Sequence, residues 1–216
     1  MTPDEASHGG RTPVTGQWLP EADGRRWWFD SGSLALDFAT TGALPPGAAE
    51  HLDSDAALAA WLAERFEAVG PESRDARLDD ALMLRGAIAR LAVAAEAGTA
   101  LDPRDVDVVN LVAAMPDIPP VLGGGSRQAG RLHAAGRQAL ASIAREAVGL
   151  LGPAVAGRLR RCADPECRML YLDTSRAGSR RWCSMQRCGN RSKVRAYRAR
   201  RRPARLTHRA AEAPRG

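Results

Sequence analysis

Residues 162–188 read CADPECRMLYLDTSRAGSRRWCSMQRC and contain all four cysteines of the chain. The cysteines form two pairs, Cys162 with Cys167 and Cys183 with Cys188, each with four residues inside the pair. Two short-spaced pairs supply four thiolates from two tight turns, which is what a tetrahedral zinc site needs. The spacing therefore predicts one structural Zn²⁺ in which protein thiolates fill every ligand position.

A pair of disulfides, or four unrelated buried thiols, is the alternative to zinc. Disulfide frameworks are typical of small secreted domains that follow a signal peptide. The first residues, Met1-Thr2-Pro3-Asp4-Glu5, have neither a basic start nor an apolar run. Apolar stretches such as 82–95 are interrupted by arginines and are too short to span a bilayer. We therefore expect a cytoplasmic protein that contacts no membrane.

Positive charge is confined to one end of the chain. The net charge is +6, yet residues 1–157 hold 13 arginines and 21 acidic residues, whereas residues 158–209 hold 17 basic and three acidic residues. A coding preference for arginine over lysine would not separate the charges in this way. Such a cationic segment repels itself unless an anionic partner is present, so the segregation points to a polyanion. Our leading hypothesis is that this polyanion is duplex DNA.

The hydrophobic pattern predicts a mainly α fold. It consists of a helical N-terminal domain with a small β-hairpin, followed by a small zinc finger of short strands and one basic helix. In the N-terminal domain we expect a strand or turn at 27–30, the hairpin around the glycines 123–125, and helices at 33–41, 53–70, 74–97, 102–115 and 136–151. For the short apolar run at 33–41, a strand is the alternative to a helix. In the finger we expect strands at 158–162, 169–172 and 181–182, a turn at 174–179, and a helix at 190–202.

Composition divides the chain into four segments. Residues 1–26 are rich in Gly, Pro and Thr and are expected to form a disordered arm. The helical domain then spans 27–156, the finger 157–202, and a flexible basic tail 203–216.

The predicted helix at 190–202 has two different stripes. Asn190, Val194 and Tyr197 share one stripe, which we expect to pack on Trp182 and Leu170 over the metal. The adjacent stripe of arginines is free to bind phosphates or guanine edges with paired hydrogen bonds. The predicted nucleic-acid contacts are Arg180, Arg181, Arg187, Arg191, Lys193, Arg195, Arg198 and Arg202.

Two other functions compete with DNA binding. An RNA-binding finger would stack Trp182 and Tyr197 on bases instead of packing them in its core. An enzyme in the N-terminal domain has less support, because the sequence has no Gly-rich phosphate loop, nucleophile elbow or His-rich metal motif. We expect no catalytic residues.

The stretch from Cys162 to Lys193 closely resembles the CGNR zinc finger. That family is named for the tetrapeptide that Cys188-Gly189-Asn190-Arg191 matches. The resemblance includes the aspartate Asp173 before Ser175 and the run Arg-Trp-Cys-Ser-Met that ends at Met185. Tyr171 stands where the family has Phe, a change that keeps the ring.

The N-terminal body resembles the ABATE domain, which precedes this finger in many bacterial transcription regulators often described as stress-induced. The resemblance rests on the motif at 32–38, on Leu84-Arg85 and on Asn110, while Thr40-Thr41 replaces the family's Asn-Thr pair. It implies a bacterial DNA-binding regulator whose N-terminal domain senses a signal or assembles the protein.

The expected partners of the N-terminal domain are less defined. One small finger reads few base pairs, so a homodimer is expected if the operators are specific. An unknown small-molecule ligand is the second expected partner. Asp37, Arg85 and Asn110 are the candidates for a ligand-binding or structural role, and a buried ion pair between Asp37 and Arg85 is the structural role that we favour.

Overall fold

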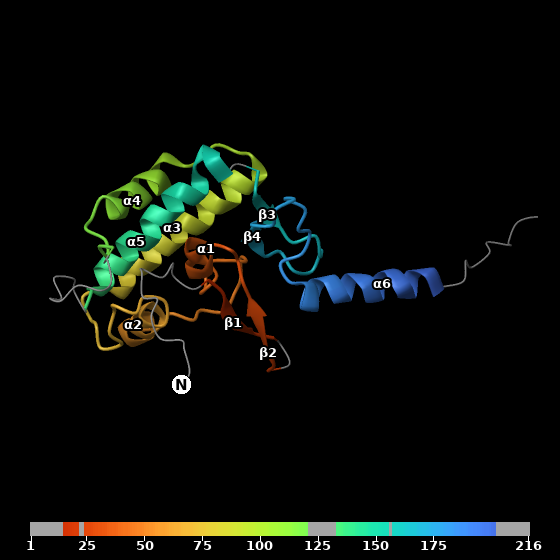
Figure 1. Cartoon of the computed structure of the whole chain (residues 1–216), viewed down its shortest axis with the longest axis horizontal. Coiled ribbons are helices and arrows are strands. Elements are labelled where there is room, and N and C mark those ends of the chain that lie inside the picture. Colours follow the sequence, from red (N-terminus) through yellow and green to blue (C-terminus); the bar gives the residue numbers. More distant parts are fainter. Residues whose placement is uncertain (1–14, 22–23, 121–132, 156, 202–216) are drawn as a thin grey trace, which may run out of the picture.

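The computed structural model describes residues 15–21, 24–120, 133–155 and 157–201. A helical body is joined to a small cysteine-rich module, and the last helix projects away from both (Figure 1). The predicted mainly α fold with a small C-terminal module is confirmed. The predicted hairpin around 123–125 lies outside the described residues.

The body is a bundle of helices around one apolar core. Helices α3, α4 and α5 lie side by side, and the short α1 packs on α3 and α5 (Figure 1). Fully buried side chains such as Leu36, Leu84, Ile88 and Ile143 fill the space between them. The bounds are α1 (Leu34–Ala39), α2 (Asp55–Ala63), α3 (Leu78–Ala97), α4 (Pro103–Ala113) and α5 (Gly136–Leu151).

Local signals in the sequence set most of the helix ends. The side chains of Ser54 and Asp102 accept backbone hydrogen bonds at the starts of α2 and α4, as predicted. Gly98 ends α3 in the left-handed conformation with φ 68. The helix predicted at 53–70 is wrong beyond Ala63, where the backbone continues as turns. Phe66 is still buried, so its spacing reflects packing rather than helical continuation.

An N-terminal β-hairpin precedes the helices. β1 (Gln17–Pro20) pairs antiparallel with β2 (Arg26–Phe29), so the segment expected at 27–30 to be a strand or a turn forms a strand as far as Phe29. The prediction of a disordered arm through residue 26 is wrong for β1. The Gln17 side chain donates to the Asp37 carbonyl at 2.8 Å and accepts from Trp61 Nε1 at 3.2 Å, so long-range contacts fix this strand.

The cysteine-rich module is a second hairpin followed by irregular backbone. β3 (Leu159–Arg161) pairs antiparallel with β4 (Leu170–Leu172), and the predicted turn at 174–179 is present. The strand predicted at 181–182 is wrong: this stretch is irregular, and the Arg181 carbonyl accepts one hydrogen bond, from Ala163 N–H at 2.9 Å. After the body, η1 (Pro153–Val155) leads into the module, and η2 (Met185–Gly189), a single π-helical turn, leads into α6 (Asn190–Arg201).

Helix α6 does not fold back over the module. It has no buried residue, and Val194 and Tyr197 are each 48% exposed. The predicted packing of the stripe that contains them on Trp182 and Leu170 is therefore wrong. The reason is tertiary, because Leu170 joins the core of the body and the hairpin β1–β2 supplies the rings that pack against the cysteines.

Candidate metal centre and nucleic-acid interface

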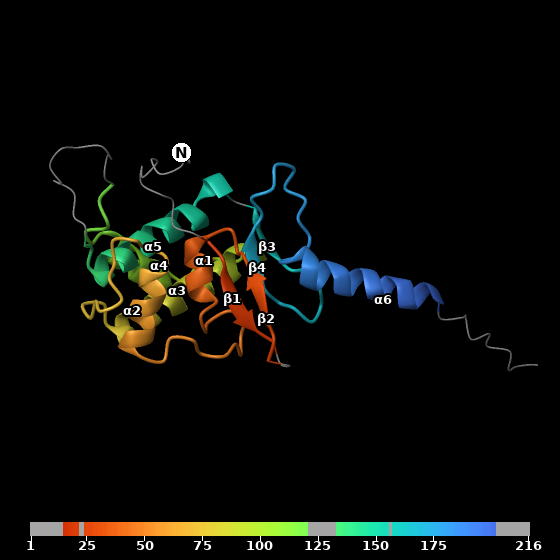
Figure 2. The ribbon, with the colours of Figure 1, turned by 60° about the horizontal axis from the view of Figure 1, so that its bottom comes forward.

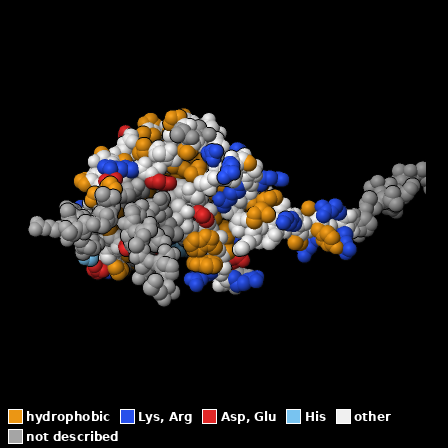
Figure 3. All heavy atoms as spheres, in the orientation of Figure 1, with side chains coloured by type: hydrophobic (Ala, Val, Ile, Leu, Met, Phe, Trp, Pro, Cys, Tyr) orange, Lys and Arg blue, Asp and Glu red, His pale blue; other side chains and the backbone are white. Residues whose placement is uncertain are grey.

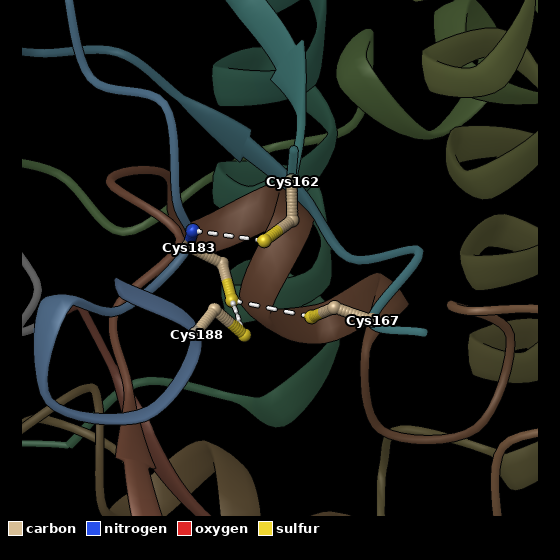
Figure 4. Close-up of side chains that lie close together, drawn as sticks. All are labelled: Cys162, Cys167, Cys183 and Cys188. Atoms are coloured by element: carbon tan, nitrogen blue, oxygen red, sulfur yellow. Dashed lines mark hydrogen bonds between the residues drawn. The ribbon is translucent and has the colours of Figure 1, made fainter. Parts of the chain in front are cut away.

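The four cysteines converge on one point (Figure 4). Their Sγ atoms lie within 4.8 Å of one another, with Cys167 to Cys183 at 3.4 Å and Cys183 to Cys188 at 3.6 Å. Tetrahedral zinc with Zn–S bonds of about 2.3 Å requires sulfurs about 3.8 Å apart. A disulfide requires sulfurs about 2 Å apart, so the disulfide alternative does not fit these distances. The geometry and the all-sulfur donor set fit one Zn²⁺.

The first cysteine pair is presented by the β3–β4 hairpin. Cys162 follows β3, and its N–H donates to the Met169 carbonyl at 2.9 Å. Cys167 closes the intervening turn by donating to the Asp164 carbonyl at 3.0 Å. One carboxylate oxygen of Asp164 also accepts from Glu166 N–H at 3.2 Å, which fixes the turn.

The second pair is presented by η2. Ser184 begins the turn, its hydroxyl accepting from Arg187 N–H at 3.3 Å and its carbonyl from Cys188 N–H at 3.0 Å. Gly189 follows, and a Cβ at that position would lie 2.9 Å from the Met185 sulfur. The Cys-Gly-Asn-Arg sequence therefore combines a ligand, a tightly packed glycine and the start of α6.

Positive groups surround the sulfurs. The Cys183 N–H donates to Cys162 Sγ at 3.4 Å, and the Arg191 guanidinium donates to Cys188 Sγ at 3.4 Å. Hydrogen bonds from the other cysteine sulfurs, that of Cys167 first, hold the pKa of the Cys162 thiol far below its ordinary value. Donors directed at sulfur stabilise thiolates, the form that binds metal.

Asp164 connects the metal centre to α6, and the sequence reasoning missed it. Its carboxylate is buried at 1% exposure and lies 3.1 Å from Arg191 Nε and 2.9 Å from Arg195 Nη2. Two of the predicted nucleic-acid contacts are thus ion-paired to the first cysteine turn. The available signal was an acid between two cysteines in a segment that has only three acids.

Two more of the predicted contacts are held inside the fold. Arg180 donates to the Asp30 carbonyl at 3.1 Å and to the Trp182 carbonyl at 3.0 Å. Arg187 donates to Glu21 at 2.6 Å, and its guanidinium lies 4.3 Å from the centre of the Trp27 ring. These arginines join the finger to the N-terminal hairpin.

The remaining predicted nucleic-acid contacts are three exposed side chains and one residue that the structure does not describe. Arg181, Lys193 and Arg198 are exposed, and none of them has an ion pair with another described residue. Arg181 packs over the Trp182 ring, with 5.0 Å from its guanidinium carbon to the ring centroid. Arg202 lies outside the described residues. The assignment of these side chains to nucleic-acid contacts stays a prediction.

The finger shares its cores with the rest of the chain. Buried Phe29 packs with the four cysteines, Met169 and Tyr171, and partly buried Leu19 and Trp27 pack against the same cluster. On the other side, Leu159 and Leu170 belong to the core of the body. Leu172 N–H donates to the Ser31 carbonyl at 2.7 Å, and Arg161 pairs with Glu96 on α3 at 2.6 Å. The metal centre is therefore built onto the body and its hairpin.

The three candidate residues of the body do not form one cluster. Asp37 accepts from the Gly16 N–H, whereas Arg85 pairs with Glu50 and donates to Thr41 at 3.2 Å. The predicted ion pair between Asp37 and Arg85 is therefore wrong, because Glu50 from the neighbouring loop takes the guanidinium. That guanidinium lowers the pKa of Glu50 to about 2. Asn110 is exposed on α4.

Asp37→Asn should remove a pH dependence of folding. Burial raises the pKa of the Asp37 carboxyl from 3.8 to about 6, against hydrogen bonds from Ser31 and Gly16 and the charge of Arg65. Because the folded-state pKa is the higher one, the stability tied to this proton is complete below about pH 4 and is lost as the pH rises through about 6. The variant should gain roughly 3 kcal/mol relative to wild type between about pH 4 and pH 7.

Urea unfolding of both proteins across this pH range measures the effect. Both carry the same cysteines, so metal loss in acid affects both equally. A stability difference that does not change with pH would contradict the prediction.

The fold and the site define a class of protein: a helical body that carries a four-cysteine zinc module with a projecting basic helix. The family model of ABATE, described as "Putative stress-induced transcription regulator", matches residues 32–153. This match covers more than half of the chain, which therefore belongs to the ABATE family. The CGNR zinc finger matches residues 158–201, and its four cysteines hold one structural zinc.

A search of curated proteins finds no match to this chain. Among the helices of the described residues, none combines the length and apolar character that crossing a bilayer requires.

Proposed function

We propose that this protein is a cytoplasmic, DNA-binding transcription regulator in which the zinc finger presents α6 to duplex DNA. The observation that carries the proposal is the exposure of α6. Six of its twelve residues are Arg or Lys, none is acidic, and none is buried. A helix of this length extends about 18 Å, and its diameter suits the major groove of B-DNA.

The zinc has a supporting role in this proposal. All four ligand positions are filled by thiolates, so the metal is structural and has no open position for a substrate or water. It fixes the turn η2, from which α6 begins, while the pairs of Arg191 and Arg195 with Asp164 fix the direction in which the helix leaves the finger. Lys193, which lies between these two arginines, and the arginines that follow Arg195 then meet the nucleic acid.

In this proposal, the two predicted domains have different roles. The body, 27–156, senses a signal or forms a homodimer, and the finger, 157–202, binds DNA. The name of the ABATE family supports regulation as the outcome. The shared cores of body and finger give a physical route by which a change in the body would reach the finger.

Removal of three exposed cations from α6 tests the proposal. Lys193→Ala/Arg198→Ala/Arg201→Ala should reduce the slope of log affinity against log salt concentration by about two to three, if each residue contacts one phosphate. Fluorescence anisotropy with labelled duplex DNA over a salt series measures this slope. Arg104→Ala is the control, because Arg104 is exposed on α4, which lies across the body from α6 (Figure 1).

Unchanged binding by the triple variant would show that α6 is not part of the interface.

Competition between duplex DNA and single-stranded RNA separates the proposal from the RNA alternative. Tyr197 is exposed and lies beneath the Arg201 guanidinium, with 4.8 Å from the guanidinium carbon to the ring centroid, so one ring is available for stacking on a base. Tighter binding of the RNA would overturn the DNA proposal.

A further inference from the structure

The N-terminal hairpin has two faces of opposite character. Its strands alternate, so Gln17, Leu19, Trp27 and Phe29 share one face, and the last three of these pack on the cysteine cluster. The other face carries Trp18, which is 56% exposed, Trp28, which is 43% exposed, and the exposed Arg26. The hairpin thus uses one face to build the finger and leaves the second face uncovered.

The tryptophans of the uncovered face are cross-strand partners. Trp18 and Trp28 stand opposite each other, with ring centroids 5.5 Å apart in an edge-to-face arrangement. The Arg26 guanidinium carbon lies 5.9 Å from the Trp18 ring centroid. Two half-exposed indoles beside a cation form an unusual surface for a protein that has only five tryptophans.

This hairpin lies beside the start of α6 (Figure 2). A groove of about 770 Å³ runs between them, lined on one side by hairpin residues that include Trp18, Arg26 and Trp28. The other side is formed by η2 and by Asn190, Val194 and Arg198 of α6. Orange side chains beside blue ones cover the hairpin tip, and blue ones follow α6 (Figure 3). The groove is therefore continuous with the proposed recognition helix.

The charge in the groove is unbalanced. Two acids line it, Glu21 and Glu166, and both are already engaged: Glu21 by Arg187 at 2.6 Å and Glu166 by Arg195 at 3.9 Å. Arg26 and Arg198 line the groove from opposite sides, and neither forms an ion pair with any carboxylate in the described part of the chain. A groove with this excess of cations fits a polyanion.

We propose that the uncovered face of the β1–β2 hairpin is a second DNA contact, which holds the sugar-phosphate backbone beside the site occupied by α6. Arg26 binds a phosphate, and the indoles of Trp18 and Trp28 pack on the adjacent sugars. Phosphate contacts of this kind set the register and orientation of a reading element on the duplex. The inference rests on the proposed DNA-binding function, and it gives the hairpin that precedes the ABATE match a direct role in the interface.

Two hairpin variants and one α6 variant form the test, each checked for zinc content and for its circular dichroism spectrum. Arg26→Ala should reduce the salt slope of duplex binding by about 0.9, which is roughly fivefold to tenfold weaker binding at about 0.1 M salt. Trp18→Ala/Trp28→Ala should weaken binding roughly threefold to tenfold at an unchanged slope, because an uncharged ring releases no counterion. The α6 triple variant reports on the recognition helix, and Arg104→Ala is again the control.

The outcomes separate the two proposals. Weakened binding by both hairpin variants, with the slope changed only by Arg26→Ala, supports the second contact. Wild-type affinity in both hairpin variants, together with weakened binding by the α6 variant, overturns the second contact and leaves the proposed function intact. No salt-dependent duplex binding by the wild-type protein overturns both. A tryptophan variant that changes the oligomeric state, or weakens only single-stranded DNA binding, assigns the face to a different occupant and overturns the inference.

Discussion

Cys188→Ser should abolish zinc binding and unfold the finger, rather than weaken it by a small amount. Structural zinc supplies on the order of 10 kcal/mol of apparent folding free energy to a small module. Cys188 is fully buried and lies within η2, the turn from which α6 begins. Loss of this ligand leaves three buried thiolates around an incomplete site, and the turn η2 has no other buried side chain to hold it.

The structure extends this expectation beyond the finger. Phe29 packs with the cysteines, and Leu159 and Leu170 complete the core of the body. Unfolding of the finger should therefore also release the N-terminal hairpin and lower the thermal midpoint of the body.

Zinc content by atomic emission, together with thermal melting followed by circular dichroism, measures both effects. Met185→Ser is the control, because Met185 lies in the same turn but is 52% exposed. A folded, metal-free Cys188→Ser protein that still bound DNA would contradict the structural role of zinc.

Phe29→Ala should destabilise the zinc finger although Phe29 lies far from it in the sequence. The side chain is fully buried between the Trp27 ring, at a centroid distance of 5.5 Å, and the cysteine cluster. Replacing a fully buried Phe with Ala costs about 3–5 kcal/mol, through lost burial and the cavity that remains. Because zinc binding and folding of the finger are linked, the variant should also lose zinc to a chelator at lower chelator concentrations than wild type.

Trp28→Ala provides a matched control for this experiment. Trp28 is the neighbouring residue on the same strand, but it points to the uncovered face and is 43% exposed. Its loss should leave chelator resistance close to that of wild type. Equal zinc loss by the two variants would show that the hairpin as a whole, and not the buried face, supports the finger.

Several features of this protein were predictable because they depend on neighbours in the sequence. The cysteine spacing predicted the metal centre, since each pair closes its own turn. Ser54, Asp102 and Gly98 predicted helix ends because caps act within one helical turn. The charge segregation predicted a basic helix at the C-terminal end, which α6 provides.

The errors share a different cause. Helix 53–70 was predicted too long, because Phe66 is buried by tertiary packing at a spacing that also suits a helix. The prediction of an Asp37–Arg85 ion pair was wrong because the Arg85 guanidinium forms its ion pair with Glu50, which is far from Arg85 in the sequence. Similarly, an acid between two cysteines was visible in the sequence, but the pairing of Asp164 with Arg191 and Arg195 depends on where the tertiary structure places α6.

The sequence by itself determined the ligand set of the metal centre, the helical class of the body and the excess of positive charge near the C-terminus. Only the tertiary structure decided what those charges face. Glu21 meets Arg187 and Phe29 meets the cysteines across more than a hundred residues of chain, and such contacts depend on packing between elements rather than on local spacing. That packing separates the arginines that hold the finger together from the ones that remain at its surface.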